Sequence, residues 1–411
     1  MDPAIDLAAI EAAAVALKGH VVRTPTVPAP ALSRLSGAEV FLKLENLQAT
    51  ASFKVRGAYI KLAALADAGQ VNGVVAASAG NHAQGVAYHA QALGLPATIV
   101  MPADTPFSKI SRTEALGAHV MLFGDGLAEA RAEAQRLEAE GGLAFIHPYD
   151  DPLIITGQGT VGLEMLTDVP DLDILVVPIG GGGLMAGTAV AAKAMKPDIS
   201  IIGVEAEGYA SMSDVLAGRP SPKGGPTIAE GIAVKEPGVL NRSLIEPRID
   251  DIIVVPEVAI ERAVQDLAEY ERIVAEGAAA TAWAAIRLHP ARFEGKRVGA
   301  VISGGNMDSR LLASILLRGL VYSGRIAKLR IEITDKPGAL AAVTRIIGEA
   351  GGNIVEVVHQ RMFHNVPVKL ADLDVVVETR DKSHVARLLK ALAQGGYSAR
   401  LLSSTSEDEW L

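Results

Sequence analysis

Lys54 is the residue whose surroundings most suggest chemistry. It lies in the run Ala51-Ser52-Phe53-Lys54-Val55-Arg56-Gly57-Ala58. A lysine amine has an ordinary pKa of about 10.4, so at neutral pH it is protonated and does not attack a carbonyl carbon. Apolar neighbours and a nearby cation both lower that pKa, and Phe53, Val55 and Arg56 supply both kinds. Lys54 is therefore a candidate for Schiff-base formation. Most lysines are solvated surface groups, however, and its position alone leaves that alternative open.

Three other segments place a polar or glycine-rich turn between an apolar run and a helix-like stretch. They are Ser78-Ala79-Gly80-Asn81-His82, Gly180-Gly181-Gly182-Gly183-Leu184 and Ser303-Gly304-Gly305-Asn306. Backbone N–H groups at a helix start bind anions, so the first segment suits a substrate carboxylate. The second has four residues without Cβ atoms and suits a phosphate, although it is neither a Walker loop nor a spaced dinucleotide motif. An ordinary capped turn and a flexible loop are the structural alternatives.

Short Val- and Ile-rich runs alternate with Ala- and Leu-rich stretches from about residue 38 to residue 320. This alternation predicts βαβ crossovers and a parallel sheet, which is an α/β fold. Open parallel sheets bind ligands beyond the carboxyl ends of their strands, where the turns described above would lie. The expected strands include 73–77, 97–101, 120–123, 174–179, 201–204 and 299–302.

The pattern changes after Arg325, where a second and smaller domain is expected. Its order of strands and helices predicts a ferredoxin-like βαββαβ module at 328–404, joined to a first domain (1–320) by a linker at 321–327 and followed by a tail at 405–411. The expected elements are strand 328–334, helix 339–350, strands 354–362 and 368–379, helix 383–394 and strand 397–402.

Composition excludes several classes of protein. The 411 residues carry a net charge of -9 and no concentrated run of Lys and Arg, which argues against a nucleic-acid partner. The chain has no cysteine, which removes disulfides, thiolate catalysis and cysteine-bound metals, and its nine histidines show no metal-binding spacing. We expect a small polar substrate and no metal. A reducing cytoplasm is compatible with this composition.

Neither a signal peptide nor a membrane span is expected. The N-terminus carries Asp2, Asp6 and Glu11 where a signal peptide has a basic region, and it predicts an amphipathic helix. The uncharged stretch 174–192 is long enough to raise the question of a span, but Pro178 and four consecutive glycines interrupt it. We expect strand, loop and helix there, and a cytoplasmic protein.

Taken together and in this order, these segments and Glu45-Asn46-Leu47-Gln48 resemble the fold-type-II pyridoxal-phosphate enzymes, and within them the serine/threonine dehydratases. The resemblance covers residues 5–320. It implies two open parallel-sheet subdomains, of which the smaller, at about 47–149, is inserted in the larger. The module at 328–404 resembles an ACT domain, a regulatory module.

The resemblance also implies roles for the residues. Lys54 holds the cofactor, pyridoxal 5'-phosphate, as a Schiff base and then acts as the base at the substrate Cα. Phe53 packs beside the pyridine ring, Asn81 meets the ring hydroxyl and Ser303 approaches the ring nitrogen. A neutral hydroxyl does not keep that nitrogen protonated, which favours prompt expulsion of a β-substituent over transamination. The phosphate is held by Gly180, Gly181, Gly182, Gly183 and Leu184, and the substrate carboxylate by Ser78, Ala79, Gly80, Asn81 and His82.

Three departures from the family pattern refine these roles. Ala79 stands where serine racemases of the family have a serine that acts on the opposite face, so racemisation is disfavoured and Lys54 is the only expected Cα base. Some relatives bind a divalent metal through an acid at the position of Glu205 and another six positions later, but here the second position is Ser211. We expect no tight Mg²⁺ site there. Ala51 stands where glycine is frequent.

The resemblance implies a regulated lyase. Residues 227–234 (Thr-Ile-Ala-Glu-Gly-Ile-Ala-Val) resemble a run of the threonine dehydratases that has Asp in place of Glu. We expect dehydration and deamination of threonine to 2-oxobutanoate and ammonia, with serine as a poorer substrate and control by an amino acid. Isoleucine is the expected effector, as isoleucine biosynthesis would require. The expected effector site comprises Asp335, Pro337, Gly338, Ala339, Leu340, Asn353 and Ile354.

Alternatives remain at this point. Within the same family the substrate could be serine or hydroxyaspartate. From a different class, the chain could be a catalytically inactive amino-acid sensor, although intact Lys54, Asn81 and Ser303 argue against that. The ACT-like module could serve oligomerisation without a ligand. We expect a homodimer or a homotetramer.

Overall fold

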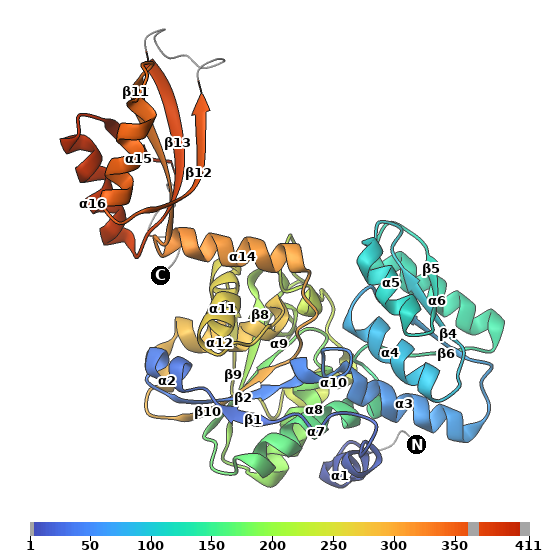
Figure 1. Ribbon diagram of the computed structural model, residues 1–411. Coiled ribbons are helices and arrows are strands. Elements are labelled where there is room, and N and C mark those ends of the chain that lie inside the picture. The colour runs from blue at the N-terminus through green and yellow to red at the C-terminus, as the bar shows by residue number, and fades with distance from the viewer. Residues whose placement is uncertain (1–3, 361–369, 403–411) are drawn as a thin grey trace. The chain divides into compact units, whose positions relative to one another are not determined.

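The computed structural model describes residues 4–360 and 370–402. The chain divides into two compact units, with the boundary between Met307 and Asp308 (Figure 1). The end of the strand expected at 354–362, the start of the one expected at 368–379 and the tail expected at 405–411 lie outside the described residues.

A six-stranded sheet lies at the centre of the first unit, in the order β1-β2-β10-β7-β8-β9. Its strands pair in parallel, except that β1 is antiparallel to β2. Strands β7, β8 and β10 are buried at nearly every position, as parallel strands covered on both faces are. The strands are β1 (Thr26–Pro28), β2 (Glu39–Leu44), β7 (Ile174–Pro178), β8 (Ser200–Ala206), β9 (Asp251–Val255) and β10 (Arg297–Ile302).

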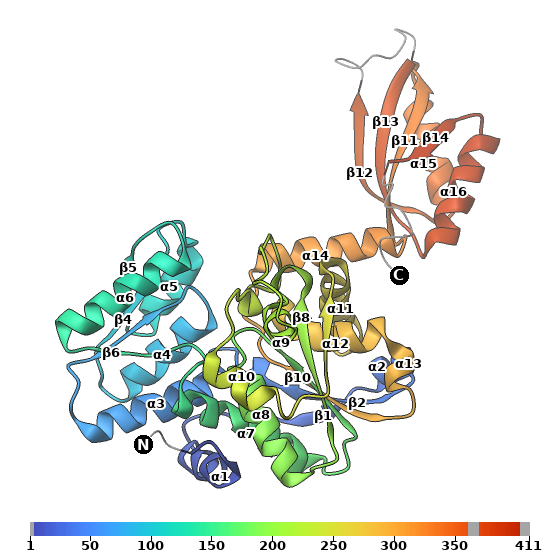
Figure 2. The same cartoon turned by 180° about the vertical axis from the view of Figure 1, so that it is seen from behind.

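Helices cover both faces of this sheet. Helices α7 and α8 lie on one face and α11 and α12 on the other (Figures 1 and 2). On the first face, Leu175 and Val177 of β7 belong to one apolar core with Met165 and Met185. The elements of this subdomain outside the sheet are α1 (Leu7–Ala16), α2 (Pro30–Ser36), η1 (Glu45–Leu47), α7 (Pro152–Asp168), α8 (Gly183–Met195), η2 (Glu207–Tyr209), α9 (Ser211–Leu216), η3 (Glu230–Ile232), α10 (Val239–Ile245), α11 (Glu257–Tyr270), α12 (Gly277–Leu288) and α13 (Pro290–Phe293).

A second parallel sheet forms the smaller subdomain of this unit, in the order β5-β4-β3-β6. Its centre consists of fully buried aliphatic side chains such as Val74, Ile99 and Met101. The two open parallel sheets confirm the predicted α/β fold. The elements are α3 (Lys54–Ala68), β3 (Val74–Ala77), α4 (Asn81–Ala92), β4 (Ala97–Met101), α5 (Phe107–Ala115), β5 (His119–Leu122), α6 (Leu127–Gly141) and β6 (Ala144–Phe145).

The second unit contains the predicted βαββαβ module, with a four-stranded antiparallel sheet in the order β12-β13-β11-β14. Alternate residues of β11 are buried, and Leu329 and Ile331 pack with Val343 and Leu388 of the two helices. This strict alternation is what one covered sheet face requires. The elements are α14 (Ser309–Tyr322), β11 (Ile326–Thr334), α15 (Ala339–Glu349), β12 (Asn353–Gln360), β13 (Leu370–Glu378), α16 (Lys382–Gln394) and β14 (Ser398–Leu401).

The boundary between the two compact units precedes α14, whereas the domain boundary predicted from the sequence follows residue 320. Helix α14 continues through a tight turn into β11, where the carbonyl oxygen of Leu320 accepts a hydrogen bond from the Arg325 N–H at 2.8 Å. The carbonyl oxygen of Arg325 in turn accepts from the Thr379 N–H at 2.8 Å. The predicted linker at 321–327 is therefore mostly the end of a helix and the start of a strand.

The uncharged stretch 174–192 forms β7, the glycine loop and part of α8, as predicted. Among the residues that the structure describes, no helix has both the length and the apolar character needed to cross a membrane.

Candidate active site

One cavity lies where the two parallel sheets of the first unit present the ends of β3, β7 and β10. Its volume is about 290 Å³, close to the lower limit of roughly 300 Å³ for small-molecule sites. Every residue predicted to hold cofactor or substrate lines it. These are Phe53, Lys54, Ser78, Ala79, Gly80, Asn81, His82, Gly180, Gly181, Gly182, Gly183, Leu184 and Ser303. The structure thus brings all four sequence segments together, while the individual roles remain predictions.

Lys54 is the first residue of α3, and its amine faces the cavity. The Nζ atom donates a hydrogen bond to the carbonyl oxygen of Pro148 at 2.7 Å and lies 5.3 Å from the centre of the Phe53 ring. Burial lowers the pKa of Lys54 to about 8, although the nearby Glu276 carboxylate opposes this shift. A buried amine with a lowered pKa is the form of lysine that condenses with an aldehyde.

The loop before α3 is bound to the end of β10. The Phe53 N–H donates to the carbonyl oxygen of Ser303 at 3.1 Å, and the Gly305 N–H donates to that of Ala51 at 2.8 Å. Ala51 has a φ of 55°, in the left-handed region that side chains other than glycine rarely adopt. Glycine, which the resemblance implies is frequent at this position, adopts this conformation without such strain.

Replacing Ala51 with glycine is expected to stabilise the protein slightly. Alanine in the left-handed region costs about 1–2 kcal/mol, whereas glycine loses about 0.4–1 kcal/mol more chain entropy on folding. The expected net gain is about 0.5 kcal/mol in the free energy of unfolding. Urea denaturation would measure it, and a clear loss of stability would show that the methyl group of Ala51 makes a favourable contact.

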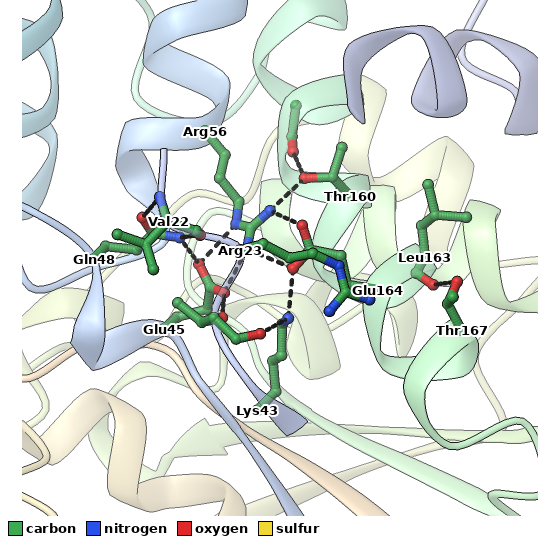
Figure 3. Close-up of polar contacts among 12 residues, drawn as sticks. Val22, Arg23, Lys43, Glu45, Gln48, Arg56, Thr160, Leu163, Glu164 and Thr167 are labelled. Atoms are coloured by element: carbon green, nitrogen blue, oxygen red, sulfur yellow. Dashed lines mark hydrogen bonds and ion pairs between the residues drawn. The ribbon is translucent and has the colours of Figure 1, made fainter. Parts of the chain in front are cut away.

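A buried cluster of four charged side chains fixes the first turn of α3. Arg56 donates two hydrogen bonds to Glu45 and two to Glu164, all at 2.8 Å, and a fifth to Thr160 at 3.0 Å (Figure 3). Lys43 forms an ion pair with Glu164. Burial alone would raise the pKa of Glu45, but the charge and hydrogen bonds of Arg56, with smaller contributions from Lys43 and Thr24, together lower that pKa. The cluster ties the helix that carries Lys54 to η1 and to α7.

The turn at 78–82 ends β3 and begins α4. His82 has its Nε2 atom 2.9 Å from the carbonyl oxygen of Ile146, and burial lowers the pKa of His82 to about 3. His82 is therefore neutral at physiological pH, and it fixes the turn instead of supplying a positive charge. Asn81 donates from Nδ2 to Glu276 at 2.7 Å and accepts from Asn306 at 3.1 Å. Asn81 is thus held in one orientation at the N-terminus of α4, where an anion is favoured.

Glu276 is a site residue that the sequence reasoning missed. It precedes α12, lines the cavity and donates from its backbone N–H to the carbonyl oxygen of Gly304 at 3.1 Å. Burial raises the pKa of Glu276 to about 7, although the hydrogen bond from Asn81 acts to lower it. The available signal was a single carboxylate just before the Ala-rich helix 277–288, because a helix start stabilises a carboxylate whereas apolar surroundings require it to have a partner.

The glycine loop has room only for residues without a side chain, so its backbone is exposed to the cavity. A Cβ atom on Gly181 would lie 2.2 Å from Cγ of Tyr149, and one on Gly180 would lie 2.9 Å from Cα of Ile232. Gly182 has a φ of 100°, and α8 begins directly after it. The loop therefore presents bare backbone at a helix N-terminus of the cavity, as phosphate binding requires.

The segment 146–149 contributes to the site through its backbone. The carbonyl oxygens of Ile146 and Pro148 bind His82 and Lys54, as described above. That of Tyr149 accepts from Nδ2 of Asn241 at 3.1 Å. Neither Tyr149 nor Asn241 was predicted from the sequence.

Two polar contacts join the smaller subdomain to the larger one beside the cavity. Lys109 of α5 pairs with Glu230 at 2.6 Å, and Arg112 donates to Asn306 at 2.9 Å. Glu230 is the residue that replaces Asp in the family run. Its carboxylate is thus engaged by the opposite subdomain.

Glu205 accepts hydrogen bonds from the backbone N–H groups of Met212 and Ser213 at 2.7 and 2.9 Å. Burial raises the pKa of Glu205 to about 7. Within residues 4–360 and 370–402, no group of three or more His, Asp or Glu is placed to hold a metal ion.

The two segments of the expected effector site lie at opposite ends of the second unit's sheet. The turn that contains Asp335, Pro337 and Gly338 follows the last residue of β11, which pairs with Leu370. Asn353 pairs with Glu378, opposite the first residue of β11. The two ends of β11 are eight residue steps apart, or about 26 Å. Within one copy of the chain the segments cannot form one site; the remaining predicted residues, Ala339 and Leu340, lie with the turn and Ile354 lies with Asn353.

Capture of the cofactor by the cofactor-free protein is expected to become faster with rising pH, around a midpoint near 8. Only the neutral amine of Lys54 adds to an aldehyde, so capture should slow about tenfold for each pH unit below the pKa. Glu276→Gln removes a charge that favours the protonated amine and should move the midpoint lower. Stopped-flow absorbance would follow the reaction. A midpoint of 10 or above would mean that the amine is not buried as described.

Comparisons with known proteins agree with this geometry. Residues 17–304 match the family model described as "Pyridoxal-phosphate dependent enzyme", and residues 327–394 match that of the ACT domain. An L-threonine ammonia-lyase of Thermotoga maritima is 45% identical over 400 residues, which cover 97% of this chain and 100% of the relative.

Two solved structures are also similar. The processed form of threonine deaminase isoform 2 from Solanum lycopersicum has a TM-score of 0.72 and 37% identity, covering 76% of this chain and 87% of that one. Maize serine racemase has a TM-score of 0.71 and 34% identity, and the match covers 78% of this chain and 99% of the racemase. The cavity that Lys54 lines lies within the matched region, and the chain belongs to the pyridoxal-phosphate-dependent enzymes.

Proposed function

We propose that the chain dehydrates and deaminates L-threonine to 2-oxobutanoate and ammonia, with Lys54 as the catalytic base. The observation that supports this most is that Lys54, the glycine loop and the turn at 78–82 line one cavity. The threonine substrate is supported by the Thermotoga maritima relative, which matches both units of the chain. L-Serine, converted to pyruvate, is the expected side substrate. The cysteine-free composition supports a cytoplasmic location.

Each group of cavity residues has its own role in the proposed reaction. Bound pyridoxal phosphate supplies the electron sink that makes the substrate Cα proton acidic. The N-terminus of α4, with Ser78 to His82, binds the substrate carboxylate. Lys54 accepts the Cα proton, for which its lowered pKa suits it at neutral pH. Asn81 is held by Glu276 and Asn306, and it fixes the cofactor's orientation.

Elimination is favoured over racemisation because Ala79 lines the cavity without a hydroxyl group. Inversion at Cα needs a second proton donor on the face opposite to the base. With Lys54 alone, a proton that leaves Cα returns only from the same side. Loss of the β-hydroxyl group is then the productive outcome.

Comparing the release of 2-oxo acid from threonine, serine and hydroxyaspartate tests the substrate assignment. We expect the highest kcat/KM for threonine. If threonine were the poorest of the three, the assignment would be wrong and a serine or hydroxyaspartate lyase would replace it.

We also infer that the second unit binds an amino-acid effector between two copies of the chain. The separation of Asp335 and Asn353 within one copy supports this, because a second copy can bring one segment to the other. A homodimer or homotetramer follows. The effector must bind one quaternary state more tightly, since equal affinity for both would shift nothing.

Threonine deamination with and without isoleucine, valine and AMP tests this regulation. We expect isoleucine to inhibit, and Asn353→Ala to weaken its effect without changing the uninhibited rate. Light scattering would give the subunit number. A monomer, or no response to any of the three ligands, would contradict the inference.

A further inference from the structure

Asn241 is a fully buried polar residue on α10 that reaches the glycine loop from outside the cavity. Its Nδ2 atom donates to the carbonyl oxygen of Gly181 at 2.9 Å and to that of Tyr149 at 3.1 Å. The same Gly181 oxygen accepts a second hydrogen bond, from the Gly238 N–H at 3.0 Å. Two donors outside the loop therefore hold one peptide group of the phosphate cradle.

The orientation of that peptide group determines the direction in which the Gly182 N–H points. The described chain contains no cis peptide bond, so the carbonyl of Gly181 and the N–H of Gly182 lie in one plane and point in opposite directions. Holding the oxygen toward α10 directs the Gly182 N–H to the other side of the loop. Gly181 and Gly182 line the cavity on that side.

A loop of four glycines does not hold such an orientation by itself. Each glycine in it has more conformations to lose than any other residue, and none has a side chain to pack. Packing from α10 supplies the missing constraint. A Cβ atom on Gly182 would lie 2.9 Å from Cβ of Asn241.

Helix α10 is itself held against the loop. The carboxylate of Asp150 accepts from the N–H groups of Val239 and Asn241 at 3.0 and 3.1 Å. The hydroxyl group of Tyr149 donates to the carbonyl oxygen of Glu236 at 3.1 Å. The segments 149–150 and 236–241 thus form a frame around Asn241.

We propose that Asn241 is a positioning residue for the cofactor phosphate. It does not touch the phosphate. By holding the Gly181 carbonyl outward, it aims the loop N–H groups at the phosphate before the cofactor arrives. This role is independent of which hydroxy-amino acid is the substrate.

The test compares pyridoxal phosphate with pyridoxal, which lacks the phosphate group. For cofactor-free Asn241→Ala, we expect the dissociation constant of pyridoxal phosphate to rise about tenfold, as the loss of one or two hydrogen bonds predicts. The constant for pyridoxal should change less than about twofold. Both are measured from the visible absorbance of the lysine-bound form, which does not depend on turnover.

Two further variants separate the hydrogen bonds from packing and from stability. Asn241→Asp keeps the shape but cannot donate to two carbonyl oxygens, so it should lose phosphate-dependent affinity at least as much as Asn241→Ala. Ser36→Ala removes a buried hydroxyl that donates to Leu32 at 3.0 Å in α2, away from the cavity, and should leave both constants unchanged.

Equal losses for pyridoxal phosphate and pyridoxal would overturn the proposal, because they would show a general structural defect. Wild-type affinity in Asn241→Asp would also overturn it, since packing alone would then suffice. If Asn241→Ala does not fold, the Asp variant and its ratio of the two dissociation constants decide the question.

Discussion

Replacing Lys54 with alanine is expected to lower 2-oxobutanoate formation from threonine by at least about 10³-fold. In the proposed mechanism Lys54 both holds the cofactor and takes the Cα proton, and Ala79 on the cavity wall offers no substitute base. The fold should survive, because within residues 4–360 and 370–402 the Lys54 amine makes only one hydrogen bond, to a backbone oxygen. Circular dichroism and gel filtration would establish folding, and a coupled assay would give the rate.

Two controls sharpen this prediction. Lys18→Ala changes an exposed lysine and should leave the rate unchanged. Small primary amines added to Lys54→Ala should restore part of the activity, because they replace a base and not a structural contact. A variant that kept more than about 1% of the wild-type rate would contradict the role of Lys54 as the sole Cα base.

Replacing Arg56 with methionine is expected to destabilise the protein by about 3–5 kcal/mol. The change leaves Glu45 without a cation in contact and Glu164 with Lys43 alone, in surroundings where an uncompensated charge is expensive. Methionine keeps most of the volume, so the loss would arise from charge and hydrogen bonding. The midpoint of urea denaturation would measure it.

Arg136→Met is the matched control for this change. Arg136 also bridges two carboxylates, those of Glu133 and Glu140, but Arg136 itself and Glu140 are exposed on α6. Water and salt weaken such pairs, so its effect on the midpoint should be much smaller. Similar effects of the two substitutions would mean that the buried cluster carries no special stability.

The sequence predicted the parts of the fold that depend on local pattern. The run 97–101 is β4 residue for residue, and β11 lies within two residues of its expected limits, because burial on one or both faces imposes its period directly on the sequence. The turns after β3, β7 and β10 were found because parallel strands end at the same edge of a sheet. The boundary at Met307 was not found, because α14 has the same apolar composition as the helices before it.

The missed site residues share a physical reason. Glu276 and Asn241 do not follow a strand, and Tyr149 follows only the two-residue strand β6. Each acts through a partner far away in the chain. Glu276 binds Asn81, which is 195 residues away, and Asn241 binds Gly181, which is 60 residues away. Only the folded chain brings such pairs together.

The backbone contacts of the segment 146–149 have a consequence for how this enzyme tolerates change. His82, Lys54 and Asn241 each bind a carbonyl oxygen of this segment, and every amino acid carries that group. Side chains along the segment could therefore be exchanged without deleting any of the three contacts. Inserting or removing one residue would displace all three at once. Relatives should thus keep the segment's length more strictly than its residue types, except at Tyr149, whose hydroxyl group holds Glu236.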